Sequence, residues 1–234
     1  MTKGTLYGLG IGPGDSDLIT VKALKILKSV DILVYPAPLD GDSLARKIID
    51  PHLDKKYTEI AIKMPLENSQ FPSDEVYGEA TTKISKLLDS GSDIAAICEG
   101  DPFLYGSFIY LFERLIKTEK VVVVPGVSSP MACAAILGKP LVTKNDCLVI
   151  IPGTLPEEQI IKKMEVAEGV VVVKIGRHIK KILSALKKSG LMDNAQYIER
   201  AGLKEERIVP LSEISAPVPY FSIIMAHRRG DAWK

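Results

Sequence analysis

The stretch LYGLGIGPGDSDLIT, residues 6–20, decides how the first part of the chain folds. An apolar run passes into four alternating glycines and a proline, and an apolar pattern of helical spacing then runs over residues 18–30. A strand, a glycine turn and a helix are predicted, with Asp15 or Ser16 capping a helix that begins near Asp17. Because glycine permits positive φ and close approach to a ligand, the turn is either a plain β–α turn or a ligand loop.

The glycines do not match the dinucleotide-binding fingerprint, which is GxGxxG with an acid at the end of the second strand. No register that begins at Gly8, Gly10 or Gly12 ends on a third glycine. The nearest later acid, Asp31, begins the second predicted strand, which ends at residues 35–36. No Gly-Lys-Ser/Thr follows either, so a Walker phosphate loop is excluded and an NAD oxidoreductase is disfavoured.

Apolar runs and helical patterns alternate through the first half of the chain. The predicted strands cover residues 5–11, 31–36, 57–62, 93–98 and 121–124, and the predicted helices 18–30, 43–50, 74–90, 105–117 and 128–137. We expect Pro36 to stop the second strand. Continuous apolar strands separated by helices imply a parallel sheet with right-handed crossovers.

The order of predicted strands and helices changes after about Gly138. Predicted strands now follow one another more closely, at residues 147–153, 169–177, 195–202, 206–211 and 220–229, with helices near 156–167 and 178–189. Residues 138–140 are a plausible linker. The prediction is an α/β protein of two domains, residues 1–138 with a parallel sheet and residues 139–234 with a mixed sheet, with a cleft between them.

Two further loops follow predicted strands of the first half. Residues 99–102 are Glu-Gly-Asp-Pro and residues 125–129 are Pro-Gly-Val-Ser-Ser. The carboxyl ends of parallel strands meet at one edge of a sheet, where ligands bind, although turn chemistry alone explains each loop singly. These loops contain no lysine or arginine that could bind a phosphate chain. The acids Glu99 and Asp101 instead favour a cation or hydroxyl groups, as in a nucleoside with a positive centre.

Composition limits the function classes. The chain has 234 residues, 46% of them hydrophobic, and a formal net charge of +1, which argues against a nucleic-acid-binding surface. The three cysteines are far apart and form no metal-ligand cluster, so we expect neither disulfides nor a bound metal. No apolar run approaches the roughly 20 residues of a membrane span, and the N-terminus lacks the apolar core of a signal peptide, so a cytoplasmic protein without membrane partners is expected.

Three motifs together carry a family resemblance. GIGPGDSDLIT at 10–20, CEGDPFLYG at 98–106 and VVPGVSS at 123–129 resemble, in this order, the tetrapyrrole methylases, which use S-adenosylmethionine (SAM). The runs EGDPFLYGSFIYL at 99–111 and IERAG at 198–202 resemble the members that methylate C20 of precorrin-2 or cobalt-factor II. Methylation of another corrin or siroheme intermediate, such as uroporphyrinogen III, is the alternative within the family. A nucleotide-sensing module without turnover is the non-enzymatic alternative.

The resemblance implies a homodimer that binds SAM in the cleft, acts on a tetrapyrrole and releases S-adenosylhomocysteine. The positions that match SAM contacts of the family are Pro13, Glu99, Gly100, Asp101, Leu104, Ser128, Ser129, Ile175, Ala201, Pro219, Tyr220 and Phe221. Methyl transfer needs alignment more than a strong base, and Tyr105 and Lys174 are candidate catalytic groups for the proton that leaves the acceptor carbon. Basic groups expected to hold substrate carboxylates are Arg46, Lys63, Arg177 and Arg200, with His178 and Arg228 as further possibilities.

Overall fold

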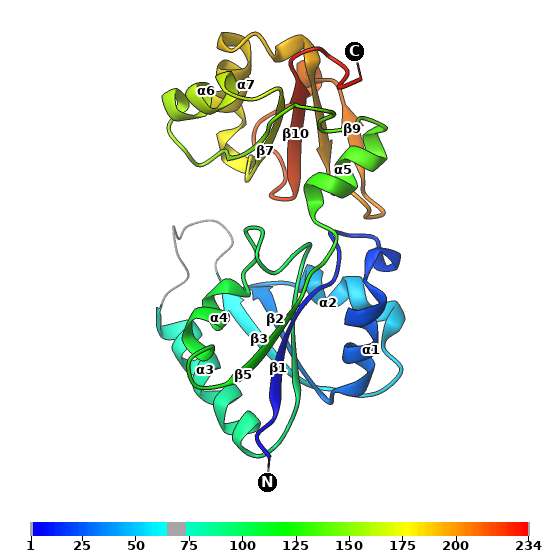
Figure 1. Cartoon of the computed structure of the whole chain (residues 1–234), viewed down its shortest axis with the longest axis vertical. Coiled ribbons are helices and arrows are strands. Elements are labelled where there is room, and N and C mark those ends of the chain that lie inside the picture. Colours follow the sequence, from blue (N-terminus) through cyan, green and yellow to red (C-terminus); the bar gives the residue numbers. More distant parts are fainter. Residues whose placement is uncertain (1, 65–73, 234) are drawn as a thin grey trace. The chain divides into compact units, whose positions relative to one another are not determined.

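The computed structural model describes residues 2–64 and 74–233 and divides the chain into two compact units, Met1–Ser128 and Ser129–Lys234. Each unit is built around one five-stranded sheet with helices against it (Figure 1). The division falls at 128/129, whereas the sequence favoured 138/139. The intervening helix α5 (Ser129–Leu137) belongs to the second unit because its buried Cys133 packs against the second sheet.

The first sheet is wholly parallel, as predicted. Its strands are β1 (Thr5–Gly10), β2 (Ile32–Pro38), β3 (Thr58–Met64), β4 (Ile94–Cys98) and β5 (Lys120–Val124). Their order is β3-β2-β4-β1-β5, so β1 lies between β4 and β5 in register with both. The glycine loop after β1 therefore lies between the loops that follow β4 and β5.

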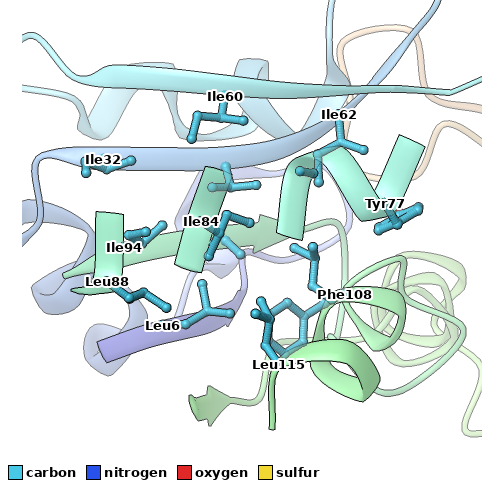
Figure 2. Close-up of a cluster of buried hydrophobic side chains, with 14 of the residues drawn as sticks. Leu6, Ile32, Ile60, Ile62, Tyr77, Ile84, Leu88, Ile94, Phe108 and Leu115 are labelled. Carbon is cyan, nitrogen blue, oxygen red and sulfur yellow. The ribbon is translucent and has the colours of Figure 1, made fainter. Parts of the chain in front are cut away.

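Helices cover both faces of this sheet. Helices α1 (Val21–Ser29) and α2 (Leu44–Ile49) lie on one face, and α3 (Asp74–Asp89) and α4 (Ile109–Leu115) on the other (Figure 1). Alternate residues of each strand enter opposite cores, so that Leu6 packs on the α3 side and Leu9 on the α1 side. Figure 2 shows the α3–α4 core, in which Ile84 and Leu88 of α3 meet strand residues such as Leu6.

Two local predictions were wrong. Strand β2 does not stop at Pro36 but pairs with β3 as far as Pro38, because its ladder with β4 ends at Val34 and proline then has no partner on that side to lose. Asp15 caps only a short 3₁₀ turn, Ser16–Leu18, and α1 begins later, where the Thr20 hydroxyl accepts the N–H of Ala23 at 3.2 Å.

The second sheet is mixed, as predicted. It contains β6 (Leu148–Pro152), β7 (Gly169–Val173), β8 (Ala195–Glu199), β9 (Arg207–Val209) and β10 (Ser222–His227), in the order β6-β7-β10-β8-β9. The central β10 is antiparallel to both β7 and β8. Helices α6 (Glu157–Glu165) and α7 (Ile179–Lys188) cover one face and α5 the other. No helix among the described residues is long and apolar enough to cross a membrane.

Candidate functional site

The loops after β1, β4 and β5 contact one another at the carboxyl edge of the first sheet. Gly100 donates its N–H to the Gly12 carbonyl at 2.8 Å, and Gly12 returns a weaker bond to Gly100 at 3.4 Å. The N–H of Gly126 donates to Oδ2 of Asp101 at 3.0 Å. The three Gly/Pro loops expected from the sequence to converge are thus joined by hydrogen bonds, and Pro13 lies half-buried among them.

This junction requires glycine at two positions. A Cβ on Gly126 would lie 2.1 Å from the Gly100 carbonyl oxygen, and a Cβ on Gly10 would lie 2.6 Å from the Gly126 nitrogen. Real Cβ atoms do not approach other atoms so closely, so the backbones of all three loops pack directly on each other. Of the glycines that failed the dinucleotide fingerprint, Gly10 is the one that this close packing requires.

Asp101 uses its carboxylate to shape the loop. Its Oδ1 accepts the N–H of Phe103 at 2.9 Å and that of Leu104 at 3.2 Å, while Oδ2 accepts Gly126. Both oxygens therefore bind backbone donors of the protein. Residues 100–104 can therefore contact a ligand mainly through their main chain, which this carboxylate holds in place.

Glu99 lies beside the same loop. Its Oε1 accepts the N–H of Ala45, in the first turn of α2, at 3.2 Å. Burial raises the pKa of the Glu99 carboxyl, and the backbone hydrogen bonds that it accepts oppose this rise. A buried carboxylate in this position favours a cationic partner over an anionic one.

The third loop, residues 125–129, follows β5 and contains two serines. Ser128 is buried, and Ser129 is the first residue of α5. Both lie where the sequence expected ligand contacts, directly beyond the junction of Gly126 with Asp101.

In the second unit, the expected residues gather at one edge of the sheet. Lys174 and Ile175 follow β7, Ala201 follows β8, and residues 219–221 precede β10. Because β10 is antiparallel to both neighbours, its beginning lies beside their ends, and the Arg200 N–H donates to the Phe221 carbonyl at 2.7 Å. We call the segments 174–177, 200–202 and 219–221 the Lys174 edge.

Strained backbone with positive φ occurs at several residues that the sequence predicted for the site. Among the described residues, the non-glycine residues with positive φ are Tyr105 (58°), Lys144 (50°), Lys174 (55°) and Arg200 (52°). The left-handed conformation is uncommon for residues with a Cβ and is enriched at functional sites. Three of the four are residues that the sequence had singled out for catalysis or substrate binding.

The expected basic residues differ in what they contact. Arg46 lies in α2, where its Nε donates to Glu59 at 3.1 Å and its Nη1 to Asp50, so a substrate carboxylate would have to replace one of these partners. Arg228 donates to the carbonyls of Met164 and Ala167 and so closes the C-terminal end of α6.

The other basic residues lie nearer solvent. Lys63 on β3 is exposed, as is Arg177, whereas Arg200 on the Lys174 edge is half-buried. Burial, together with Lys181 and Arg177, lowers the pKa of His178, so this side chain is expected to be neutral at pH 7. No group of three or more potential metal ligands occurs among the residues that the structure describes.

Sequence reasoning missed three buried polar residues of the second sheet: Tyr197, Glu199 and Ser222. Their side chains form a hydrogen-bonded chain behind residues 219–221. The available signal was Glu199 itself, a carboxylate within an apolar strand, which is buried only with partners.

Both the sequence and the fold of the chain match those of known proteins. The sequence model of the family described as "Tetrapyrrole (Corrin/Porphyrin) Methylases" matches residues 5–215. The chain is 33% identical to "Precorrin-2 C(20)-methyltransferase" of Sinorhizobium sp, covering 99% of this chain and 96% of that one. It is 32% identical to "Cobalt-precorrin-2 C(20)-methyltransferase" of Salmonella typhimurium, covering 98% of each.

Other relatives are longer. "Cobalamin biosynthesis protein CobIJ" of Mycobacterium tuberculosis is 37% identical over 95% of this chain, but the match spans only 46% of that protein.

Among solved structures, a cobalt precorrin-4 methyltransferase has the same fold, with a TM-score of 0.75, 21% identity and coverage of 97% of this chain and 96% of that one. A uroporphyrin-III C-methyltransferase from Thermus thermophilus, complexed with S-adenosylhomocysteine, gives a TM-score of 0.71 at 21% identity, with coverage of 95% and 97%.

Proposed function

The chain belongs to the tetrapyrrole methylase family, and on this premise we propose that it transfers the methyl group of SAM to C20 of precorrin-2 or of its cobalt-containing form, in cobalamin biosynthesis. The observation that supports this substrate is the 32–33% identity, over nearly the whole chain, to proteins named as C20-methyltransferases. Catalysis by this chain alone is part of the proposal, because it spans about half the length of the CobIJ relatives.

The residues of the first unit fit SAM as the cofactor. SAM supplies a sulfonium methyl group for an in-line displacement. The junction of the Gly10, Gly100 and Gly126 backbones presents main chain at the carboxyl edge of the sheet, and the buried Glu99 carboxyl favours a cation. No basic residue lies in these loops to favour a phosphate-bearing ligand instead.

The cofactor contacts that we propose are those expected from the sequence. In the first unit they come mainly from main chain at Pro13, residues 99–104 and Ser128, because the Asp101 side chain is already bonded to the loops. In the second unit they come from Ile175, Ala201 and residues 219–221 at the Lys174 edge, together with Ser129 at the start of α5.

The catalytic demand on the protein is chiefly orientation. A meso carbon of a reduced tetrapyrrole is already nucleophilic, so holding it in line with the methyl group supplies most of the rate enhancement. Tyr105 is 48% exposed in the loop after β4, and Lys174 is half-buried at the end of β7. We assign them to stabilising charge or accepting the proton that leaves C20 after methylation.

Assembly and compartment complete the proposal. A homodimer is inferred from the family resemblance, and sedimentation velocity would test it by giving twice the 25.5 kDa chain mass. The three cysteines are all unpaired, which supports a reducing compartment such as the cytoplasm.

The deciding experiment is anaerobic incubation with methyl-labelled SAM, run in parallel on precorrin-2 and on cobalt-factor II. The expected product carries one label at C20 by NMR, and the faster substrate identifies the metal state. A third reaction with uroporphyrinogen III tests the alternative. Label at another carbon, or on uroporphyrinogen III alone, would overturn the C20 assignment within the family. Failure to bind SAM would refute the methyltransferase proposal.

A further inference from the structure

Four polar side chains form a continuous chain through the second sheet. Tyr197 and Glu199 lie on one face of β8, and Ser222 of β10 lies opposite Glu199. Arg207 of β9 faces Glu199 from the other side. Tyr197, Glu199 and Ser222 are exposed by only 1%, 4% and 2%, whereas the Arg207 side chain reaches solvent.

The contacts connect the solvent-exposed Arg207 with the Lys174 edge, although their donors do not all point one way: Tyr197 donates back to Glu199, whereas Ser222 donates on to Pro219. Arg207 donates from Nη1 to Oε1 of Glu199 at 3.2 Å. Tyr197 donates its hydroxyl to Oε2 of Glu199 and lies 3.0 Å from the Ser222 hydroxyl. Ser222 donates to the carbonyl of Pro219 at 2.7 Å. Burial and the Glu199 carboxylate raise the pKa of the Tyr197 phenol, so it remains a donor at neutral pH.

The last of these bonds acts on main chain. The carbonyl of Pro219 accepts the Ser222 hydroxyl, that of Tyr220 accepts the Ser222 N–H at 3.0 Å, and that of Phe221 accepts the Arg200 N–H at 2.7 Å. Arg200 directly follows β8 and Ser222 begins β10, so the Phe221 end of the segment is attached to one strand and the Pro219 end to its neighbour. The side chains of Tyr220 and Phe221 remain exposed and pack edge-on with ring centroids 5.1 Å apart.

Packing alone does not require this arrangement. The surrounding core on the same face is apolar, with Ile224, Val172 and Ile175 as neighbours in one cluster. A buried carboxylate and two hydroxyls among such residues cost stability unless each is bonded, and here each one is. In several proteins, buried polar groups of this kind fix one geometry of the surrounding chain.

We propose that Tyr197, Glu199 and Ser222 are positioning residues that hold main chain 219–221 and 200–201 in the geometry that binds SAM. They touch the ligand only through these segments. The inference rests on the proposed function for the identity of the ligand, but not for the ordering of the segment. Loss of a hydroxyl should therefore weaken SAM binding and loosen residues 216–222, without altering the chemical step.

The test compares Ser222→Ala and Tyr197→Phe with Ser184→Ala. Ser184 is a matched control because its hydroxyl also makes a hydrogen bond within the second unit, to Glu157 at 2.8 Å, but joins α7 to α6. Ser222→Thr keeps a hydroxyl on the strand and serves as the rescue. Three quantities are measured: the Kd for SAM by calorimetry, KM and kcat for each substrate, and hydrogen exchange of peptides covering residues 198–203 and 216–222.

We expect Ser222→Ala and Tyr197→Phe to raise the Kd and KM for SAM about 3- to 10-fold, the factor for one lost hydrogen bond. The KM for the tetrapyrrole should be unchanged, and the Arg200 amide should exchange faster. Ser184→Ala should lower only the melting temperature, and Ser222→Thr should restore SAM binding. Equal SAM affinity and equal exchange in wild type and both test variants would overturn the positioning role.

The two proposals can fail separately. If wild-type protein binds no SAM, the proposed function is refuted, and hydrogen exchange still decides whether the hydroxyls hold the segment. If wild-type protein binds and transfers methyl, while the variants match it in affinity and exchange, only the positioning role is refuted.

Discussion

The Asp101 carboxylate accepts the N–H of Gly126 at 3.0 Å, which joins the loop after β4 to the loop after β5. The same carboxylate accepts two N–H groups of its own loop. One side chain therefore determines the shape of the carboxyl edge of the first sheet at three backbone positions.

Replacing Asp101 by asparagine should weaken this junction. The amide of Asp101→Asn keeps one acceptor oxygen but sets an NH₂ group against an N–H donor, leaving a partly buried donor unsatisfied at a cost of about 1 kcal/mol. We expect the Kd for SAM to rise by up to about tenfold, as measured by calorimetry. The control is Asp93→Asn, because Asp93 accepts the Thr5 N–H at 2.7 Å at the opposite end of the sheet. Equal SAM affinity in the two variants would contradict this role of Asp101.

Adding a methyl group at Gly126 should separate the loops. The new Cβ of Gly126→Ala would lie 2.1 Å from the Gly100 carbonyl oxygen, so the backbone must shift. Overpacking of this kind costs roughly 1–3 kcal/mol, and we expect SAM binding to be lost together with this stability. Gly78→Ala on α3 is the matched control, since its Cβ meets nothing within 4 Å and should stabilise the helix by up to about 1 kcal/mol. Urea unfolding and calorimetry of both variants check the prediction.

Neutralising Lys174 should affect turnover more than binding. We expect Lys174→Met to lower kcat by about 100-fold, the lower end of the range for a general acid or base, with the Kd for SAM unchanged. Lys144→Met is the control, because Lys144 has a similar φ of 50° but lies outside the Lys174 edge. If kcat of the two variants is equal, Lys174 has no catalytic role, and Tyr105 or water accepts the proton.

Glu99 should make stability depend on pH. Burial raises the pKa of its carboxyl, so ionising Glu99 costs more in the folded than in the unfolded protein. The stability that this group contributes is full below its ordinary pKa and is lost as the pH rises through the raised value. We therefore expect Glu99→Gln to melt at a higher temperature than wild type at pH 7, with the difference disappearing near pH 4.

The same variant should bind SAM less tightly, because the proposed cofactor site loses a negative charge that favours a cation. Thermal melts at both pH values and calorimetry at pH 7 test the two effects together. A Glu99→Gln protein that is less stable than wild type at pH 7 would show that the carboxylate is stabilising, contrary to the direction expected from its burial.

The sequence alone determined the order and type of the helices and strands. Continuous apolar runs and helical apolar patterns placed all ten strands and seven α-helices of the described structure, because burial restricts the type and spacing of residues along each element. The three Gly/Pro loops were recognisable because turns with close backbone approach restrict residue type. Their order along the chain carried the family resemblance that the family model supports.

Only the tertiary structure decided which polar groups already have partners. Arg46 was a reasonable carboxylate ligand by residue type, but it contacts Glu59 and Asp50, and Arg228 closes a helix end. Tyr197 and Ser222 are 25 positions apart and meet only through strand order. Local sequence patterns report spacing along the chain, whereas most of these hydrogen bonds join residues from distant positions, which strand pairing and the packing of helices on the sheets bring together.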